Sequence, residues 1–149
     1  MSGPSLWQAA AHQAVHEAQE TEVAQGLAWL AAFNRRQDPA AARVAAALVE
    51  TWNQRVLAHL TAEEDDLYPW LRQARPQVRG LLDQLAAEHA ALTRAVAAAR
   101  AALEEKGPDA VAAVLEPALD LLRRHARREE SLLASPAAAV PVWPVRAHS

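Results

Sequence analysis

The sequence of 149 residues contains no cysteine. The chain therefore cannot form disulfides, use a thiol nucleophile, or bind zinc or an iron–sulfur cluster through thiolates. Isoleucine is also absent, glycine occurs only four times, and aromatic residues make up 5% of the chain. Because β-branched and aromatic residues favour strands and glycine serves tight turns, these shortages argue against a β architecture.

The sequence also lacks the apolar run of ~20 residues that a membrane-spanning helix needs. Residues 1–7 have no basic region followed by an apolar stretch, so we expect a soluble, cytoplasmic protein with no membrane partner. The net charge is only −3, and the densest basic group, within residues 123–128, runs into two glutamates. This group is interpreted as the solvated face of a helix, and no nucleic-acid partner is expected.

The chain is rich in helix formers, chiefly alanine and leucine, and its length suits one domain. Short loops divide it into helical segments. Asp38 can cap a helix that has Pro39 at its first position, and Gly107 with Pro108 marks the end of one helix and the start of another. The helices are predicted over about residues 5–34, 39–73, 76–106 and 109–134.

Two prolines fall inside these segments. Pro69 should kink or terminate the second helix near its end, and Pro117 should kink the fourth. Because short loops between long helices make neighbours antiparallel, the predicted fold class is all-α, an up-down-up-down four-helix bundle over residues 1–136. Residues 137–149 form a proline-punctuated tail, whose Trp143 could dock on the bundle.

Each helical segment carries an apolar stripe in steps of three and four residues, which is typical of a helix packed in a bundle. Histidines or carboxylates interrupt every stripe. Because a buried ionisable group is costly unless it is paired or coordinates a metal, these interruptions need a common explanation. The stripes are His12, His16, Glu20, Val23, Leu27, Leu30 and Asn34; Val49, Trp52, Val56, His59, Glu63, Asp66 and Trp70; Val78, Leu82, Leu85, His89, Leu92, Val96, Ala99 and Leu103; and Val111, Leu115, Ala118, Leu122, His125, Glu129 and Leu132.

The interrupting residues lie at one depth in the predicted bundle. Counted from the loops at ~1.5 Å per residue, one histidine from each helix falls in the same layer to within about one turn. Glu63 and Glu129 each follow a histidine by four residues and therefore lie beside it. Four imidazoles and two carboxylates are predicted to converge in this layer.

The most specific local pattern is a repeated motif, H-x-x-x-E-E, at residues 59–64 and 125–130. Each copy is followed by leucine and then proline. The four-residue spacing puts imidazole and carboxylate on one helix face, which suits a terminal nitrogen ligand beside a carboxylate that bridges two metal ions. No histidine has a glutamate three residues before it, so the ferritin-type E-x-x-H pattern is absent.

These motifs resemble those of the hemerythrin-like HHE cation-binding family, over about residues 6–136. The shared pattern is a histidine on the first helix, H-x-x-x-E-E-x-x-L-Y-P at residues 59–69, E-H at residues 88–89, and H-x-x-x-E-E with a later proline at residues 125–136. The resemblance implies a non-heme di-iron centre inside a four-helix bundle. It implies that two glutamates bridge the ions and that histidines are terminal ligands: Glu63 and Glu129; His59, His89 and His125, with His16 or His12 from the first helix.

The choice on the first helix stays open. His16 fits the apolar stripe better than His12, but depth does not separate them, and both could bind. Oxygen-carrying hemerythrins have a second histidine on the third helix, four residues from the first, where this chain has Leu85 and Thr93. One iron would then have an extra open position or a substitute ligand from His12, Glu20 or water, which weakens the expectation of oxygen carriage.

Other polar and aromatic residues near the motifs are expected to have supporting roles. The acidic residues next to the motif glutamates are placed at the surface or in hydrogen bonds to the ligands: Glu64, Asp65, Asp66 and Glu130. Tyr68 and the tryptophans are expected in the core or at an interface, and His148 belongs to the tail.

Imidazole and carboxylate ligands with open positions suit iron(II), although manganese or zinc could occupy the same site. The two glutamates would offset part of the positive charge of two ferrous ions, and an oxo or hydroxo bridge between the irons would lower the remaining charge further. We expect a protein that binds or senses O₂, NO, peroxide or iron itself, with a reductase as a partner. The alternatives are a di-iron oxidoreductase acting on peroxide or NO, an iron donor in iron–sulfur cluster repair, and a metal-free helical interaction protein; the oligomeric state is not predicted.

Overall fold

The structure is a computed structural model that describes residues 9–134. The predictions for the tail at 137–149, including Trp143 and His148, and for the motif proline Pro136 lie outside the described residues. No helix within residues 9–134 is both long enough and apolar enough to cross a membrane.

The four predicted helical segments are present. Three of them are single helices: α2 (Ala9–Arg35), α6 (Arg79–Glu105) and α7 (Pro108–Ala134). The second segment is one continuous rod with two π-helical stretches, η1 and η2. It consists of α3 (Ala41–Thr51), η1 (Trp52–Leu57), α4 (Ala58–Ala62), η2 (Glu63–Leu67) and α5 (Tyr68–Ala74). A short 3₁₀ turn, η3 (Pro76–Val78), leads into α6.

The loops follow the signals that the sequence carries. Asp38 Oδ1 accepts a hydrogen bond of 2.8 Å from the Ala40 N–H, although α3 begins at Ala41 rather than at Pro39. Gly107 has a φ of +101°, in the left-handed region that glycine adopts readily, and it separates α6 from α7. Both connections are short, so each joins two antiparallel helices.

Neither internal proline ends its helix. The second rod continues past Pro69 to Ala74, so the prediction that Pro69 could terminate it is wrong. A proline ring clashes with the carbonyl four residues earlier in a regular α-helix. Here π-helical η2 precedes Pro69, and the Tyr68 N–H donates to Glu63 O, five residues back, so the wider turn accommodates the ring. Helix α7 likewise continues through Pro117.

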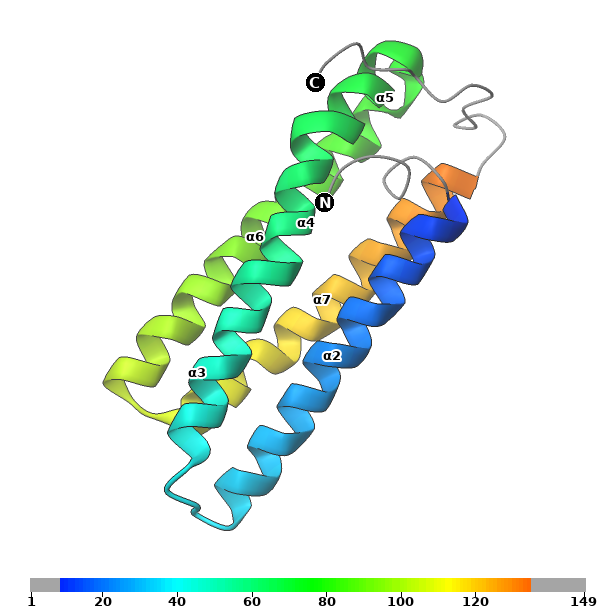
Figure 1. The fold of residues 1–149 in the computed structure, drawn as a ribbon. Coiled ribbons are helices and arrows are strands. Elements are labelled where there is room, and N and C mark those ends of the chain that lie inside the picture. The colour runs from blue at the N-terminus through cyan, green and yellow to red at the C-terminus, as the bar shows by residue number, and fades with distance from the viewer. Residues whose placement is uncertain (1–8, 135–149) are drawn as a thin grey trace, which may run out of the picture.

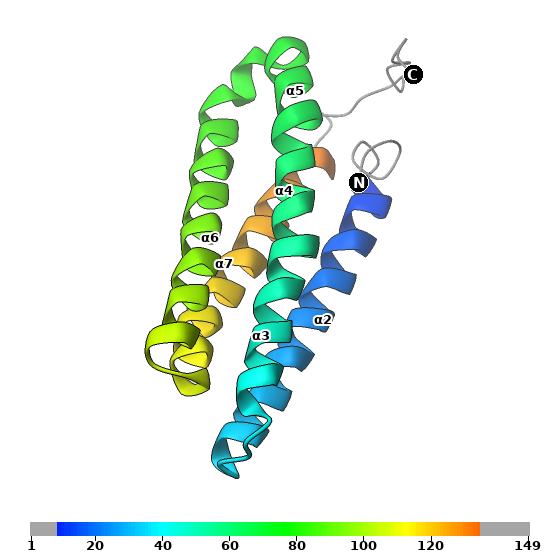
Figure 2. The same ribbon diagram turned by 60° about the vertical axis from the view of Figure 1, so that its left-hand side comes forward.

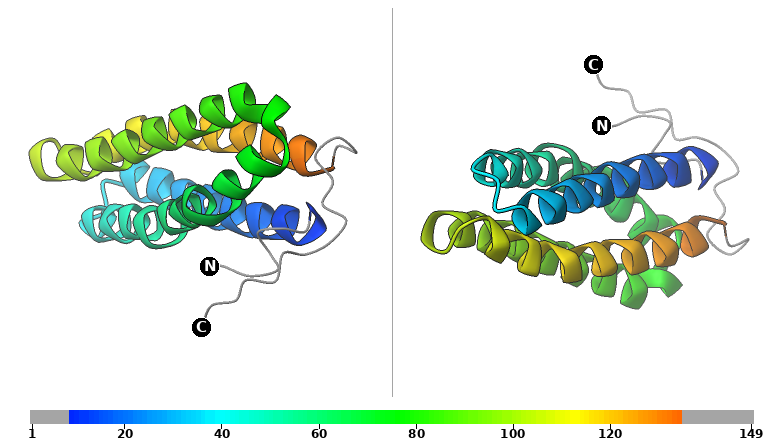
Figure 3. Two further views of the ribbon diagram at one scale, coloured as in Figure 1. Left: turned by 90° about the horizontal axis from the view of Figure 1, so that it is seen from above. Right: turned by 90° about the horizontal axis from the view of Figure 1, so that it is seen from below.

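The helices form an antiparallel four-helix bundle, which confirms the predicted all-α fold class (Figure 1). α2 lies beside α7 and α3, and α6 lies beside α7 (Figure 2). Seen from above and from below, the α2/α3 pair lies against the α6/α7 pair (Figure 3). Each rod can therefore point one face at the same central layer.

Two apolar clusters fill the interior. The large apolar cluster lies toward the end that carries the α2–α3 and α6–α7 loops, and all four rods contribute to it; it includes Leu30, Trp52, Val56, Leu92, Val96 and Leu115. The small apolar cluster lies toward the α5–η3 end and consists of Leu67, Tyr68, Leu71, Leu82, Leu85, Leu132 and Leu133. The interrupted layer of the four stripes lies between the two clusters.

Burial confirms the inward positions of the predicted stripes on α6 and α7, apart from the half-buried end residues Val78 and Leu103. On the second rod the prediction is wrong after Glu63: Asp66 and Trp70 are only half-buried. Leu67 and Leu71 are fully buried instead. The reason is η2, because its wider turn moves the inward register by one residue.

Candidate metal centre

Seven polar side chains from all four rods meet between the two apolar clusters, and none is more than 3% exposed. α2 supplies two histidines, the second rod supplies a histidine and a glutamate, α6 supplies one histidine, and α7 supplies a histidine and a glutamate. They are His12, His16, His59, Glu63, His89, His125 and Glu129. The structure therefore brings together the two glutamates and five histidines for which the resemblance implied metal binding.

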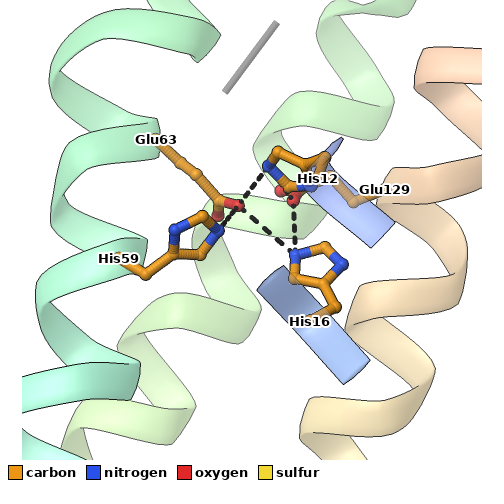
Figure 4. Close-up of side chains that lie close together, drawn as sticks. All are labelled: His12, His16, His59, Glu63 and Glu129. Carbon is orange, nitrogen blue, oxygen red and sulfur yellow. Dashed lines mark ion pairs between the residues drawn. The ribbon is translucent and has the colours of Figure 1, made fainter. Parts of the chain in front are cut away.

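These side chains form two groups that share both glutamates, and within each group the donor atoms lie within 4.8 Å of one another. The α2-side group is His12, His16, His59, Glu63 and Glu129, which Figure 4 shows in close-up. The α6-side group is Glu63, His89, His125 and Glu129. Both first-helix histidines lie in one group, so His12 does not replace the missing third-helix histidine on the α6 side.

Glu63 directs one carboxylate oxygen to each group. Its Oε2 lies 2.9 Å from His12 Nε2 and 2.8 Å from His59 Nε2. Its Oε1 lies 3.1 Å from His89 Nε2 and 3.8 Å from His125 Nε2. A carboxylate in this position can bridge two ions.

Glu129 divides its oxygens in the same way. Its Oε1 lies 3.1 Å from His12 Nε2 and 3.2 Å from His16 Nε2, whereas its Oε2 lies 3.5 Å from His125 Nε2. The two glutamates come from different rods and face each other across the bundle. The H-x-x-x-E spacing thus places both bridging candidates in the same layer, as the sequence predicts.

Most of the atoms that face the centre of the cluster have no hydrogen bond among the described residues, although they lie close together. They include His12 Nε2, His16 Nε2, His59 Nε2, both oxygens of Glu63 and Glu129 Oε1. Buried polar atoms are normally hydrogen-bonded because an unsatisfied one costs free energy. Unsatisfied nitrogen and oxygen atoms that converge on one point are what a cation would satisfy.

Three further glutamates, the outer carboxylates Glu64, Glu88 and Glu130, lie behind the imidazoles. The Nδ1–H of His16 donates to Glu130 Oε2 at 2.9 Å, and that of His125 donates to Glu88 Oε1 at 2.9 Å. His89 Nδ1 lies 3.2 Å from Glu64 Oε1. Each outer carboxylate comes from a different rod than the histidine it contacts.

The outer carboxylates explain why each H-x-x-x-E-E motif has a second glutamate. In H-x-x-x-E-E the first glutamate faces the cluster, and the second reaches a histidine of the neighbouring rod. The sequence analysis allowed this for Glu64 and Glu130 but gave no role to Glu88, although the E-H pair was a visible signal. The Nδ1 atoms of His12, His59 and His89 have no hydrogen-bond partner among the described residues.

Carboxylates and imidazoles in the cluster shift one another's pKa values. Burial lowers the pKa of the His16 and His125 imidazoles, but the close carboxylates of Glu129 and Glu63 and their charges outweigh it and raise both pKa values to about 10. Burial raises the pKa of Glu63, yet its close polar contacts with Glu129 and the histidines hold it well below its usual value. The Glu63 carboxylate is thus anionic and attracts positive charge, as imidazolium protons or as metal cations.

Tyr68 also contacts the cluster, which the sequence analysis missed when it assigned this residue to the core or an interface. Its hydroxyl donates to Glu129 Oε2 and lies 3.2 Å from His89 Nε2. Burial, together with the charges of Glu129 and Glu63, raises the pKa of the phenol far above its usual value. The periodicity of the sequence could not show this contact, because Tyr68 directly follows η2, where the shifted register turns its side chain inward.

The remaining candidates lie elsewhere. Glu20 is half-buried and belongs to neither group, and burial raises its pKa. Leu85 is part of the small apolar cluster, and the Thr93 hydroxyl donates to the carbonyl of His89 at 2.9 Å. Asp65 is exposed and Asp66 is half-buried.

The comparisons with known proteins agree with this arrangement. Residues 12–136 match the hemerythrin HHE cation binding domain, which is most of the chain. No curated protein and no solved structure matches the chain significantly. The matched residues include all seven side chains of the cluster.

Proposed function

The chain belongs to the hemerythrin HHE cation-binding family, and we propose that its buried cluster holds two iron ions and binds a small ligand, O₂, NO or peroxide, reversibly. The observation that carries this proposal is the pair of overlapping groups. Each group can hold one cation, and each shared glutamate has one oxygen in each group.

The donor set supports a metal centre of this kind. Five imidazoles and two carboxylates are the ligands that iron, manganese and zinc take in proteins, and no thiolate is present to favour a softer metal. We assign Glu63 and Glu129 as bridging ligands. The terminal ligands are His12, His16 and His59 on the α2 side and His89 and His125 on the α6 side.

When bound, two iron ions would supply open coordination positions and a change of oxidation state. The protein holds the ligands in place through the outer carboxylates, which fix the ring orientation of the histidines that they contact. The apolar clusters on both sides exclude water and bulky solutes from the layer. These features favour binding of a small uncharged or singly charged ligand over attack on a large substrate.

The first experiment measures the metal content of protein purified from iron-replete cells or loaded anaerobically with ferrous iron. The expected result is close to two irons per chain, one for each group. If no metal is present after purification and none is taken up anaerobically, the proposal is wrong.

A second experiment separates binding from turnover. Ferrous protein is mixed with O₂, its spectrum is recorded, and the gas is then removed. Recovery of the ferrous spectrum supports reversible binding. Permanent oxidation together with consumption of added peroxide or NO would instead support a di-iron oxidoreductase, which needs a reductase partner in the cell.

A further inference from the structure

The two groups differ in their number of donor side chains. The α2-side group has five, three imidazoles and two carboxylates. The α6-side group has four, because it has only two imidazoles. On α6 the positions four residues before and after His89 are Leu85 and Thr93, and neither side chain points a donor at the cluster.

Tyr68 lies at the place where the α6-side group lacks a donor. Its hydroxyl contacts Glu129 Oε2 and lies 3.2 Å from His89 Nε2. Other donor atoms of the same group have a similar spacing: His89 Nε2 lies 3.1 Å from His125 Nε2 and 3.1 Å from Glu63 Oε1.

This spacing is that of neighbouring ligands around one ion. Metal–ligand bonds of about 2.0–2.2 Å that meet near a right angle place the two donor atoms about 3 Å apart. The Tyr68 oxygen therefore stands among the donor atoms rather than behind them. The outer carboxylates differ, because they contact Nδ1, the imidazole atom that faces away from the cluster.

We propose that Tyr68 is the fifth protein ligand of the α6-side ion, through its phenolic oxygen. This inference rests on the proposed function, because it needs an ion in the α6-side group. It gives both ions five protein ligands. If the α6-side ion is six-coordinate, it then keeps one open position rather than two. Coordination forms an oxygen–metal bond and breaks the phenolic O–H bond, and the proton is released to solvent, as ligand protons are in other metal sites.

The local fold explains why a tyrosine can reach this site. The π-helical stretch η2 shifts the inward register, so Tyr68 and Glu63 on the same rod both reach the cluster layer. The ring is packed in the small apolar cluster, and it stacks on His89 with ring centroids 5.2 Å apart. The hydroxyl is thus fixed before an ion binds.

The test uses the fact that Tyr68 is the only tyrosine in the chain. The full chain is loaded anaerobically with ferrous iron, assayed for iron, and oxidised in air. Ferric phenolate gives a visible charge-transfer band and phenolate modes in the resonance Raman spectrum. Both are expected in the unmodified chain, and both should be lost in Tyr68→Phe, which keeps the packed ring.

Thr93→Val is the matched control, because it removes a hydroxyl that contacts the His89 carbonyl rather than the donor atoms. It should keep the phenolate signals. Circular dichroism checks that each variant is folded. Zinc titration gives a second readout without iron: an ultraviolet difference spectrum of tyrosinate should grow with bound zinc in the unmodified chain.

The outcomes separate this inference from the proposed function. Two irons per chain without a phenolate signal would overturn the role of Tyr68 and leave the di-iron proposal standing. A visible spectrum that is the same in the unmodified chain and in Tyr68→Phe would also overturn it, because no part of the absorption would then come from phenolate. A chain that takes up no iron and no zinc would overturn both proposals.

Discussion

The α2-side and α6-side groups share two glutamates but hold their histidines differently. On the α6 side, both imidazoles have an outer carboxylate near Nδ1: Glu88 accepts a hydrogen bond from His125, whereas Glu64 Oε1 lies 3.2 Å from His89 Nδ1 without a hydrogen bond among the described residues. On the α2 side, only His16 has one, from Glu130. The Nδ1 atoms of the other two α2-side histidines are buried without a hydrogen bond among the described residues.

This difference predicts which ion is held more firmly. A carboxylate at Nδ1 fixes the tautomer and the ring orientation of a histidine ligand and raises its basicity. We therefore expect the α6-side ion to be the tighter one and the α2-side ion to leave first, even though the α2 side has more imidazoles.

The largest effect is expected from Glu63→Ala, which removes a ligand common to both groups. Iron content should fall from two per chain to close to none, measured by elemental analysis after anaerobic loading. Asp65→Ala, an exposed acidic residue two positions away, is the control and should keep both irons. If Glu63→Ala retained one tightly bound iron, the two groups would not depend on a shared carboxylate.

Removing one imidazole from each group should separate the two ions. His12→Ala and His125→Ala each delete a histidine that lies near Glu129, one from each group. Each variant should keep one iron per chain, but the iron left in His12→Ala should resist a chelator longer than the iron left in His125→Ala. The same release rate in both, or the opposite order, would contradict the comparison.

A smaller effect is expected from Glu88→Gln, which weakens the support of His125 without removing a ligand. Loss of such a contact lowers metal affinity by about 10- to 100-fold. The decrease should be confined to the tighter ion, in a competition titration that resolves two affinities. Glu104→Gln, an exposed change on the same helix, should leave both affinities unchanged; a decrease in the weaker affinity alone would reverse the assignment.

The sequence predicts most of this site because, in a regular helix, residue number gives both the direction in which a side chain points and its depth along the bundle. The stripes on α6 and α7 and the depth count place His89, His125 and Glu129 correctly, since these helices are regular. The prediction fails where the helix changes pitch. After Glu63, η2 turns Leu67 and Tyr68 inward instead of Asp66, and a stripe drawn with a constant period cannot show this.

Contacts between rods were also beyond the sequence. Depth along the bundle does not give the direction around it, so it could not show that His12 and His16 lie in the same group or that Glu88 reaches His125 from another helix. Those facts depend on which rods are neighbours. The repeated E-E pairs were the available indication of contacts between rods, because the second glutamate of each pair contacts a histidine of a neighbouring rod.

The smallest effect is expected from Arg55→Ala, and it tests whether the α2 side is weak because of its ligands or because α2 is loosely attached. Arg55 Nε lies 3.0 Å from Glu22 Oε1, and the pair links η1 to α2 with side chains 66% and 42% exposed. An exposed pair contributes about 1 kcal/mol or less to the free energy of unfolding. Arg100→Ala is the matched control, since its pair with Glu50 joins α6 to α3 and both side chains are 50% exposed. Both variants should lower the stability slightly, in urea denaturation, and leave both iron affinities unchanged. If Arg55→Ala alone weakened the α2-side ion, then docking of the α2 helix, and not the unsupported Nδ1 atoms of its group, would account for the difference between the two sides.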